Sequence, residues 1–198
     1  MVVWTRVDAR QSRYGQPVLG SLTTAKAHDR PDLLAPCVQA ALDGLPREQV
    51  LVAEIDPELA HTAAFCERYG VTPEQSANCV VVAGRRGETT TLAACVVLAT
   101  TRADVNGLVR RRLDARKASF APMDVAVEAS GMEYGGITPV GLPAAWPVLV
   151  DAAVLEQPWV VVGSGVRRSK LVLPGALLAT LPGAEVVDGL GVPVPVPT

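Results

Sequence analysis

The sequence is poor in the side chains that carry most enzyme chemistry. Only 4% of its 198 residues are aromatic, only two are histidines, and its four cysteines form no Cys-x-x-Cys pair. Metal sites and disulfide frameworks need clusters of such residues, so we expect neither, and we predict no metal and no cofactor. The cysteines lie far apart, mostly in apolar contexts typical of buried thiols. A reduced, cytoplasmic protein is the natural interpretation.

Long apolar runs and strong net charge are also missing. No run approaches the length needed to span a bilayer, and residues 1–11 carry charges where a secretion signal would be apolar, so we predict no membrane partner. The net charge of −2 implies no general attraction to nucleic acid. Any RNA contact must therefore come from a local patch of positive charge.

The common catalytic and phosphate-binding motifs are absent. Ser164 lies between two glycines but lacks the spacing of a nucleophile elbow. His28 lies in an irregular segment and His61 one turn into a predicted helix, so surface or packing roles are expected for both. Residues 84–87 read Gly-Arg-Arg-Gly and are followed by Glu88 rather than by Lys and Ser or Thr, which predicts a hairpin turn.

What the chain does have is ample apolar sequence for one domain, at 49% of its residues. Periodicity predicts helices over residues 32–45, 56–69, 104–112 and 122–129, and strands over residues 49–55, 77–83, 91–99 and 118–120. Hairpins mixed with crossover helices favour a mixed sheet. We expect an N-terminal arm and helix over residues 1–45 with a short strand near Val18, a domain over 46–190, and a flexible proline-rich tail over 191–198.

The most unusual stretch is residues 130–143, which hold four glycines and two prolines. Such a segment is bent but stiff, because glycine permits positive φ and proline fixes its own φ. Free amide N–H groups on it could bind a developing negative charge without any charged side chain. A long turn between a helix and a strand also explains the composition, and composition alone favours that interpretation.

Gly135-Gly136-Ile137-Thr138-Pro139-Val140-Gly141 resembles the Gly-x-x-x-Pro loop of the YbaK/prolyl-tRNA-synthetase-associated domain family. Its surroundings are also similar: Asp151 closes a strand, residues 160–168 read as a strand, a small-residue loop and a basic pair, and residues 171–188 follow as strand, helix and strand. The match covers about residues 48–190. The resemblance implies an α+β single domain with a mixed, mostly antiparallel and partly barrel-like central sheet flanked by helices.

The resemblance further implies a trans-acting aminoacyl-tRNA deacylase, which hydrolyses the ester of a mischarged tRNA. Its partners would be the tRNA 3′ end and an aminoacyl-tRNA synthetase, and a free hydroxyl of the terminal ribose would help to position the water. The implied catalytic residues are Gly135, Gly136 and Asn78. The implied substrate-binding residues are Ile137, Thr138, Pro139, Gly141, Lys117, Asp151, Gly163, Ser164, Gly165 and Arg167, with Val140 and Leu142 shaping the amino-acid pocket.

The chain departs from the family at Asn78, where the family has a lysine. Asn78 could supply a hydrogen bond in its place, Lys117 could reach in from a neighbouring segment, or activity could have weakened to leave a non-catalytic tRNA- or synthetase-binding module. A role for Asn78 in capping a strand end is equally open.

Positive charge is concentrated in residues 102–117, which hold six basic and two acidic residues, and in Arg167, Arg168 and Lys170. Such local excess is expected at the rim of a phosphate-binding pocket. For Arg110 to Arg112, however, arginine is favoured anyway at a helix C-terminus. We expect Lys117 and Arg167 to lie at the rim of the pocket.

Overall fold

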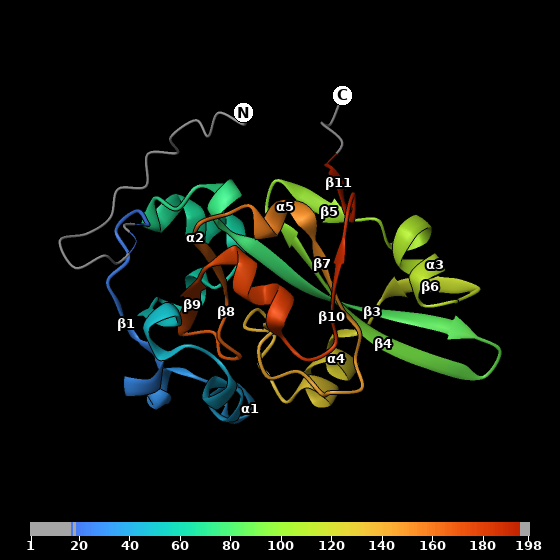
Figure 1. The fold of residues 1–198 in the computed structure, drawn as a ribbon, viewed down its shortest axis with the longest axis horizontal. Helices are drawn as coiled ribbons and strands as arrows, with labels where there is room; N and C mark the ends of the chain where they lie inside the picture. Colours follow the sequence, from blue (N-terminus) through green and yellow to red (C-terminus); the bar gives the residue numbers. More distant parts are fainter. Residues whose placement is uncertain (1–16, 18, 195–198) are drawn as a thin grey trace, which may run out of the picture.

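In a computed structural model, which describes Pro17 and residues 19–194, most of the strands form two sheets. The larger sheet contains parallel pairs on one side and antiparallel pairs on the other. Its order is β10 (Ala184–Val187), β7 (Val148–Asp151), β4 (Thr89–Leu98), β3 (Ala77–Arg86) and β6 (Lys117–Phe120). The long β3–β4 hairpin projects from one end of the molecule (Figure 1).

The smaller sheet is antiparallel throughout, in the order β1 (Thr24–Lys26), β2 (Leu51–Glu54), β9 (Ser169–Leu173) and β8 (Val160–Gly163). A single parallel bridge between Ser76 and Val161 connects it to β3 of the larger sheet. The described residues form no closed barrel. The predicted α+β single domain with mostly antiparallel pairing is therefore confirmed.

Short helices surround these sheets: α1 (Pro36–Ala41), α2 (Thr62–Tyr69), α3 (Arg110–Arg112), α4 (Met123–Ser130) and α5 (Ala152–Leu155). The core is built almost entirely from valine, leucine and alanine, as expected for a chain with so few aromatic residues. Phe65 of α2 is the largest fully buried side chain and packs on the smaller sheet. No helix in the described part of the chain is long and apolar enough to cross a membrane.

Two predicted helices and two predicted strands differ clearly in their boundaries. The helix predicted over residues 56–69 is broken into a 3-10 turn (Pro57–Leu59), capped by Asp56, and α2. The helix predicted over residues 32–45 is likewise interrupted, since Pro36 can only begin a helix. The β3 and β4 strands extend as far as Arg86 and Thr89, which moves the hairpin turn outward to Gly87 and Glu88.

The two ends of the chain fall partly outside the described residues. Val18, near which a short strand is expected, lies outside the described residues. The last four residues of the predicted tail lie outside them too. Residues Gly191–Pro193, expected to be mobile, instead form β11, which pairs antiparallel with β5 (Thr101–Ala103). Pro193, at the end of β11, has no N–H to donate. Because β11 pairs only with β5 among the described strands, no further strand loses a hydrogen bond.

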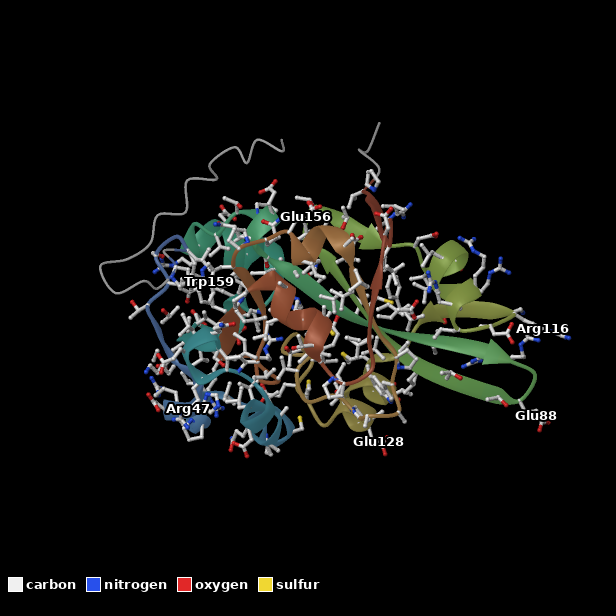
Figure 2. The ribbon with its side chains drawn as sticks, in the orientation of Figure 1. Arg47, Glu88, Arg116, Glu128, Glu156 and Trp159 are labelled. Carbon is white, nitrogen blue, oxygen red and sulfur yellow. The ribbon has the colours of Figure 1, made fainter. Side chains whose placement is uncertain are left out.

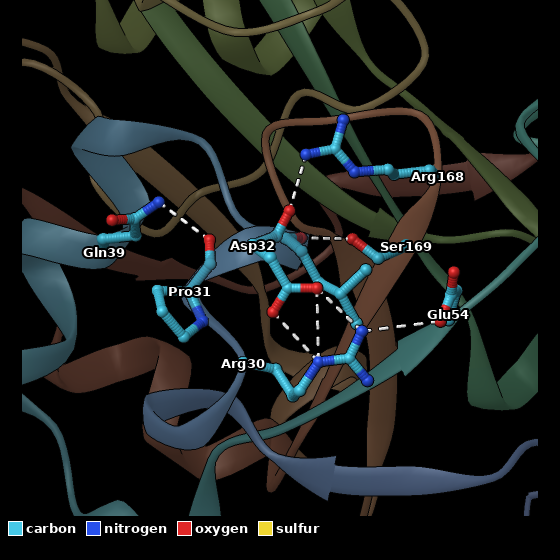
Figure 3. Close-up of polar contacts among 8 residues, drawn as sticks. Arg30, Pro31, Asp32, Gln39, Glu54, Arg168 and Ser169 are labelled. Carbon is cyan, nitrogen blue, oxygen red and sulfur yellow. Dashed lines mark hydrogen bonds and ion pairs between the residues drawn. The ribbon is translucent and has the colours of Figure 1, made fainter.

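The N-terminal segment is hydrogen-bonded to the loop that joins β8 to β9 (Figure 3). Arg168 donates to the carbonyl oxygen of Asp32 at 2.5 Å, and the hydroxyl of Ser169 donates to that of Leu33. Arg30 holds Asp32 by an ion pair of 2.8 Å. The segment therefore packs behind the β8–β9 loop. The boundaries drawn at residues 45 and 190 remain predictions.

Candidate active site

A cavity of about 380 Å³ lies where the two sheets meet. Its walls come from residues 60–62 and Phe65 around the start of α2, residues 76–81 at the start of β3, the end of β6 and the first turns of α4, residues 134, 135 and 137, the end of β8, and Lys170 of β9. The exposed aromatic rings of Phe120 and Tyr134 stand at its rim. The cavity therefore borders the glycine-rich loop that the sequence singled out.

The loop is fixed by close backbone packing against the β8–β9 loop. The carbonyl oxygen of Gly136 accepts a hydrogen bond of 2.7 Å from the N–H of Gly165. A side chain at Gly136 would come within 2.6 Å of the backbone of Val166, and one at Gly163 would overlap the carbonyl oxygens of Gly136 and Ile137. Glycine is thus required on both sides of this contact.

Among the described residues, three loop residues that line the cavity have an unpaired N–H: Tyr134, Gly135 and Ile137. Gly136 donates its N–H to the carbonyl oxygen of Glu133 at 2.9 Å, and Thr138 donates to the sulfur of Met132 at 3.4 Å. Within the described residues, the N–H groups of Gly135 and Ile137 make no hydrogen bond. Both of these residues line the cavity, and Gly135 has a φ of +84°. Together with the N–H of Tyr134, they are loop donors available to a ligand.

Asn78 lies on β3 in the cavity wall, half-buried. Its Oδ1 accepts a hydrogen bond of 2.6 Å from the hydroxyl of Thr62 on α2. This contact fixes the orientation of the amide and leaves its NH₂ group, which has no partner among the described residues, available as a donor.

Lys170 lies inside the cavity, whereas sequence reasoning only grouped it with Arg167 and Arg168 as positive charge at a rim. It is only 7% exposed, and its ammonium group donates to the carbonyl oxygens of Ala60 at 2.8 Å and Gly135 at 3.4 Å. It also lies 5.6 Å from the centre of the Phe65 ring. Burial, reinforced by the positive charge of Arg167, lowers the pKa of Lys170 to about 8. A lysine inside an otherwise apolar strand was the signal that could have identified it.

The break in the predicted helix 56–69 creates part of this site. Ala60 ends the 3-10 turn, and His61 occupies the N-cap position of α2 rather than a place one turn inside it. The carbonyl of Ala60 is therefore free to accept from Lys170. The ring of His61 lies edge-on to Tyr134, with 6.1 Å between ring centres, and both residues line the cavity.

Cysteine chemistry is disfavoured here by burial. Cys79 lines the cavity, but desolvation raises the pKa of its thiol far above the ordinary value. Burial likewise raises the pKa of Cys95 to about 12. Both thiols stay protonated at neutral pH, and the thiolate is the form that attacks. Within the described residues, no cluster of three acidic, histidine or cysteine side chains could hold a metal.

Several sequence-predicted site residues support the loop or the core instead of lining the cavity. Ser164 is fully buried, with its hydroxyl 2.7 Å from that of Ser169. Asp151 is buried too, where it caps α5 and accepts from the N–H of Gly191. A side chain at Gly141 would come within 2.5 Å of the carbonyl oxygen of Cys37. These three residues are structural in this arrangement.

The other predicted substrate contacts divide in the same way. Ile137 and Gly163 line the cavity. Thr138, Pro139 and Val140 form the buried part of the loop, and Leu142 packs against the core. Gly165, with φ +83°, anchors Gly136. Arg167 braces the loop by donating to the carbonyl oxygens of Tyr134 at 3.3 Å and Pro57 at 2.8 Å.

Lys117 belongs to a separate, exposed groove of about 560 Å³. The groove holds four basic side chains, and none of them forms an ion pair within the described residues: Arg85, Arg110, Arg116 and Lys117. Phe120 lines both the groove and the cavity. Arg116 lies toward the outer end of the β3–β4 hairpin, far from Arg47 at the opposite end of the molecule (Figure 2). We call this surface the basic groove.

Comparison with known proteins agrees with this arrangement. The family model described as "Aminoacyl-tRNA editing domain" matches residues 56–181, more than half of the chain. The crystal structure of a candidate trans-editing enzyme for prolyl tRNA synthetase is 25% identical and covers 78% of this chain and 94% of its own, with a TM-score of 0.65. The hypothetical protein APE2540, at 21% identity and a TM-score of 0.66 over 77% of this chain and 97% of its own, shares the fold.

Proposed function

Since the chain belongs to the aminoacyl-tRNA editing domain family, we propose that it hydrolyses the ester bond between an incorrect amino acid and the 3′ end of a tRNA. Such an ester is already activated, so the protein needs to supply donors and orientation rather than a strong nucleophile. An aminoacyl-tRNA synthetase that attaches the wrong amino acid would be the source of the substrate.

In the proposed reaction, a water oxygen attacks the carbonyl carbon of the ester and forms a tetrahedral oxyanion. The bond to the ribose oxygen then breaks, and that oxygen takes up a proton, so the products are the free amino acid and a tRNA with its terminal hydroxyl restored. The neighbouring ribose hydroxyl is proposed to position the water. This assignment accords with a cavity in which the described residues offer no thiolate and no serine paired with a base.

The observation that carries the proposal is the pair of unpaired amide groups at Gly135 and Ile137 beside a cavity. Preorganised amide donors stabilise an oxyanion because they need not reorient as the charge develops. The free NH₂ of Asn78 enters the same cavity from β3 and is proposed to bind the ester or the terminal ribose. Gly136, whose N–H is engaged, is proposed to act by fixing the loop.

Selectivity is proposed to come from the apolar part of the cavity. Val81, Ala126 and Ile137 line it, and its volume of about 380 Å³ suits a small amino acid. A pocket of fixed size rejects what is too large to enter, which is the logic of a second sieve in editing.

The basic groove is proposed to hold the tRNA backbone. Four unpaired cations on a nearly neutral protein form a local phosphate-binding surface. Because Phe120 is 59% exposed and borders both sites, a strand lying in the groove can place its terminal base on this ring and its aminoacyl group in the cavity.

The proposal is tested with a panel of tRNAs, each charged with one incorrect small amino acid. We expect release of at least one amino acid, and we expect Gly135→Ala to reduce that release by roughly 100-fold. The matched control is Gly87→Ala, because Gly87 also has positive φ but lies at the hairpin tip with open space around it. Binding of tRNA without release of any amino acid would contradict the proposed hydrolysis. It would instead support the alternative of a non-catalytic tRNA-binding module.

A further inference from the structure

The cavity contains a buried positive charge that has no acidic partner. Lys170 forms no ion pair within the described residues, although only 7% of it is exposed. Burying a charge without a counterion is costly, and most proteins avoid it. A charge kept in this position therefore points to a ligand that carries, or develops, negative charge in the cavity.

The ammonium group is held in place by backbone. Two of its three hydrogens are directed at the carbonyl oxygens of Ala60 and Gly135, and the ring of Phe65 packs beneath it. The third hydrogen has no partner among the described residues. Because one anchor is Gly135 itself, the charge is tied to the loop that carries the free amide groups.

Sheet register places Asn78 and Lys170 on either side of Gly163. Gly163 of β8 is the direct partner of Lys170 on β9, and the bridge between Ser76 and Val161 lies two residues before Asn78 and Gly163. Asn78 and Lys170 therefore flank Gly163 on the same face of the sheet. Gly163 has no side chain, and the carbonyl oxygens of Gly136 and Ile137 fill the space where a Cβ would lie. The loop is thus seated between an amide donor and a cation.

We propose that Lys170 is a catalytic residue of the editing reaction, whose ammonium group donates a hydrogen bond to the ester carbonyl oxygen as it becomes an oxyanion. This inference rests on the proposed hydrolysis. Lys170 keeps its proton throughout: the incoming water supplies the oxygen of the product acid and the proton taken up by the ribose oxygen. The positive charge missing at Asn78 on β3 is thereby supplied by Lys170 on β9, on the other side of β8.

This role predicts a characteristic pH dependence. Because the pKa of Lys170 is lowered to about 8, catalysis should fall as the pH rises through that value and the ammonium loses its proton. The other titratable or charged groups around it are Cys66 and His61 on α2, Cys79 on β3, Tyr134 in the glycine-rich loop and Arg167 in the β8–β9 loop. Of these groups, replacing Lys170 alone must abolish the fall in rate above about pH 8, which we call the alkaline limb.

The kinetic test uses Lys170→Met and Lys170→Arg, with Lys26→Met as the control, because Lys26 is half-buried, paired with Glu48 and does not line the cavity. For the tRNA that the native protein deacylates, Lys170→Met should lower kcat/KM by roughly 100-fold and remove the alkaline limb. Lys170→Arg should regain part of the rate and keep it above pH 8, since arginine stays charged. An unchanged rate in Lys170→Met, or a native rate that rises as Lys170 deprotonates, would overturn the proposal.

A second measurement does not depend on hydrolysis. The chain has only three lysines, so carbon-13 labelling of their side chains lets Lys170 be titrated individually by NMR. Acetate, a small carboxylate that resembles the acyl end of the product, should raise the pKa of Lys170 without affecting Lys26. If acetate leaves the Lys170 titration unchanged, the cavity does not present this charge to an acyl oxygen and the proposal fails, whether or not any tRNA is deacylated.

Discussion

The cavity and the basic groove share Phe120 but use positive charge in opposite ways. The cavity holds one lysine, almost fully buried and anchored by backbone carbonyl groups. The groove holds four exposed basic side chains. Exposed charges are screened by water and salt, whereas a buried charge acts at close to full strength on whatever lies beside it. We therefore assign the chemistry to the cavity and the docking of tRNA to the groove.

The largest effect is expected for Gly163→Ala. The new methyl group would overlap the carbonyl oxygens of Gly136 and Ile137, so the loop must shift and its donors lose their alignment. Deacylation should fall by more than roughly 100-fold, and the free energy of unfolding by about 1–3 kcal/mol. The control is Gly44→Ala, where no atom lies within 4 Å of the added carbon. Normal deacylation by Gly163→Ala would show that hydrolysis does not depend on the alignment of the loop.

A smaller effect is expected at Asn78. Removal of the amide in Asn78→Ala should reduce deacylation by roughly tenfold, as expected for the loss of one neutral donor. Asn78→Lys should give no gain, because a second ammonium would face Lys170 across Gly163 and the two charges would repel. A large gain in Asn78→Lys, measured by the same release assay, would mean that the native cavity lacks the charge that we assign to Lys170.

The groove is probed by the double change Arg110→Ala and Lys117→Ala. We expect the Kd for tRNA to rise roughly tenfold and the slope of log Kd against log salt to decrease by about 1.5, as for two lost phosphate contacts. Arg47→Ala is the control, because Arg47 is paired with Asp29 at the other end of the molecule. An unchanged salt slope in fluorescence-anisotropy titrations would place the tRNA elsewhere.

The last expected effect is on stability and not on activity. The pKa of Lys170 falls from 10.5 to about 8 on folding, so the unfolded chain binds more protons between these values and stability rises with pH there. Lys170→Met should therefore be more stable than the native chain at neutral pH, by at most about 3 kcal/mol, with the difference shrinking toward pH 10.5. Urea unfolding at both pH values measures it. A destabilised Lys170→Met at neutral pH would show that the buried charge is structural.

Local patterns predicted most elements of the fold, because strands such as β3 and β4 read directly as apolar runs. They also identified the glycine-rich loop, and the family resemblance added Asn78. Lys170 was recognised only as one of a basic group, because its burial depends on strand pairings between segments distant in sequence. For the same reason Lys117 was placed at the cavity rim, whereas the pairing of β6 with β3 carries it into the groove. Where side chains converge depends on register, which no local window contains.

One measurement compares the two regions directly: deacylation of the same amino acid from a full tRNA and from adenosine. Adenosine bears no phosphate that could reach the groove. We predict that Lys170→Met loses activity on both substrates, whereas the Arg110→Ala and Lys117→Ala double variant loses it only on tRNA. Equal losses by the groove variant on both substrates, or undiminished activity of Lys170→Met on either one, would contradict the division between a catalytic cavity and a docking groove.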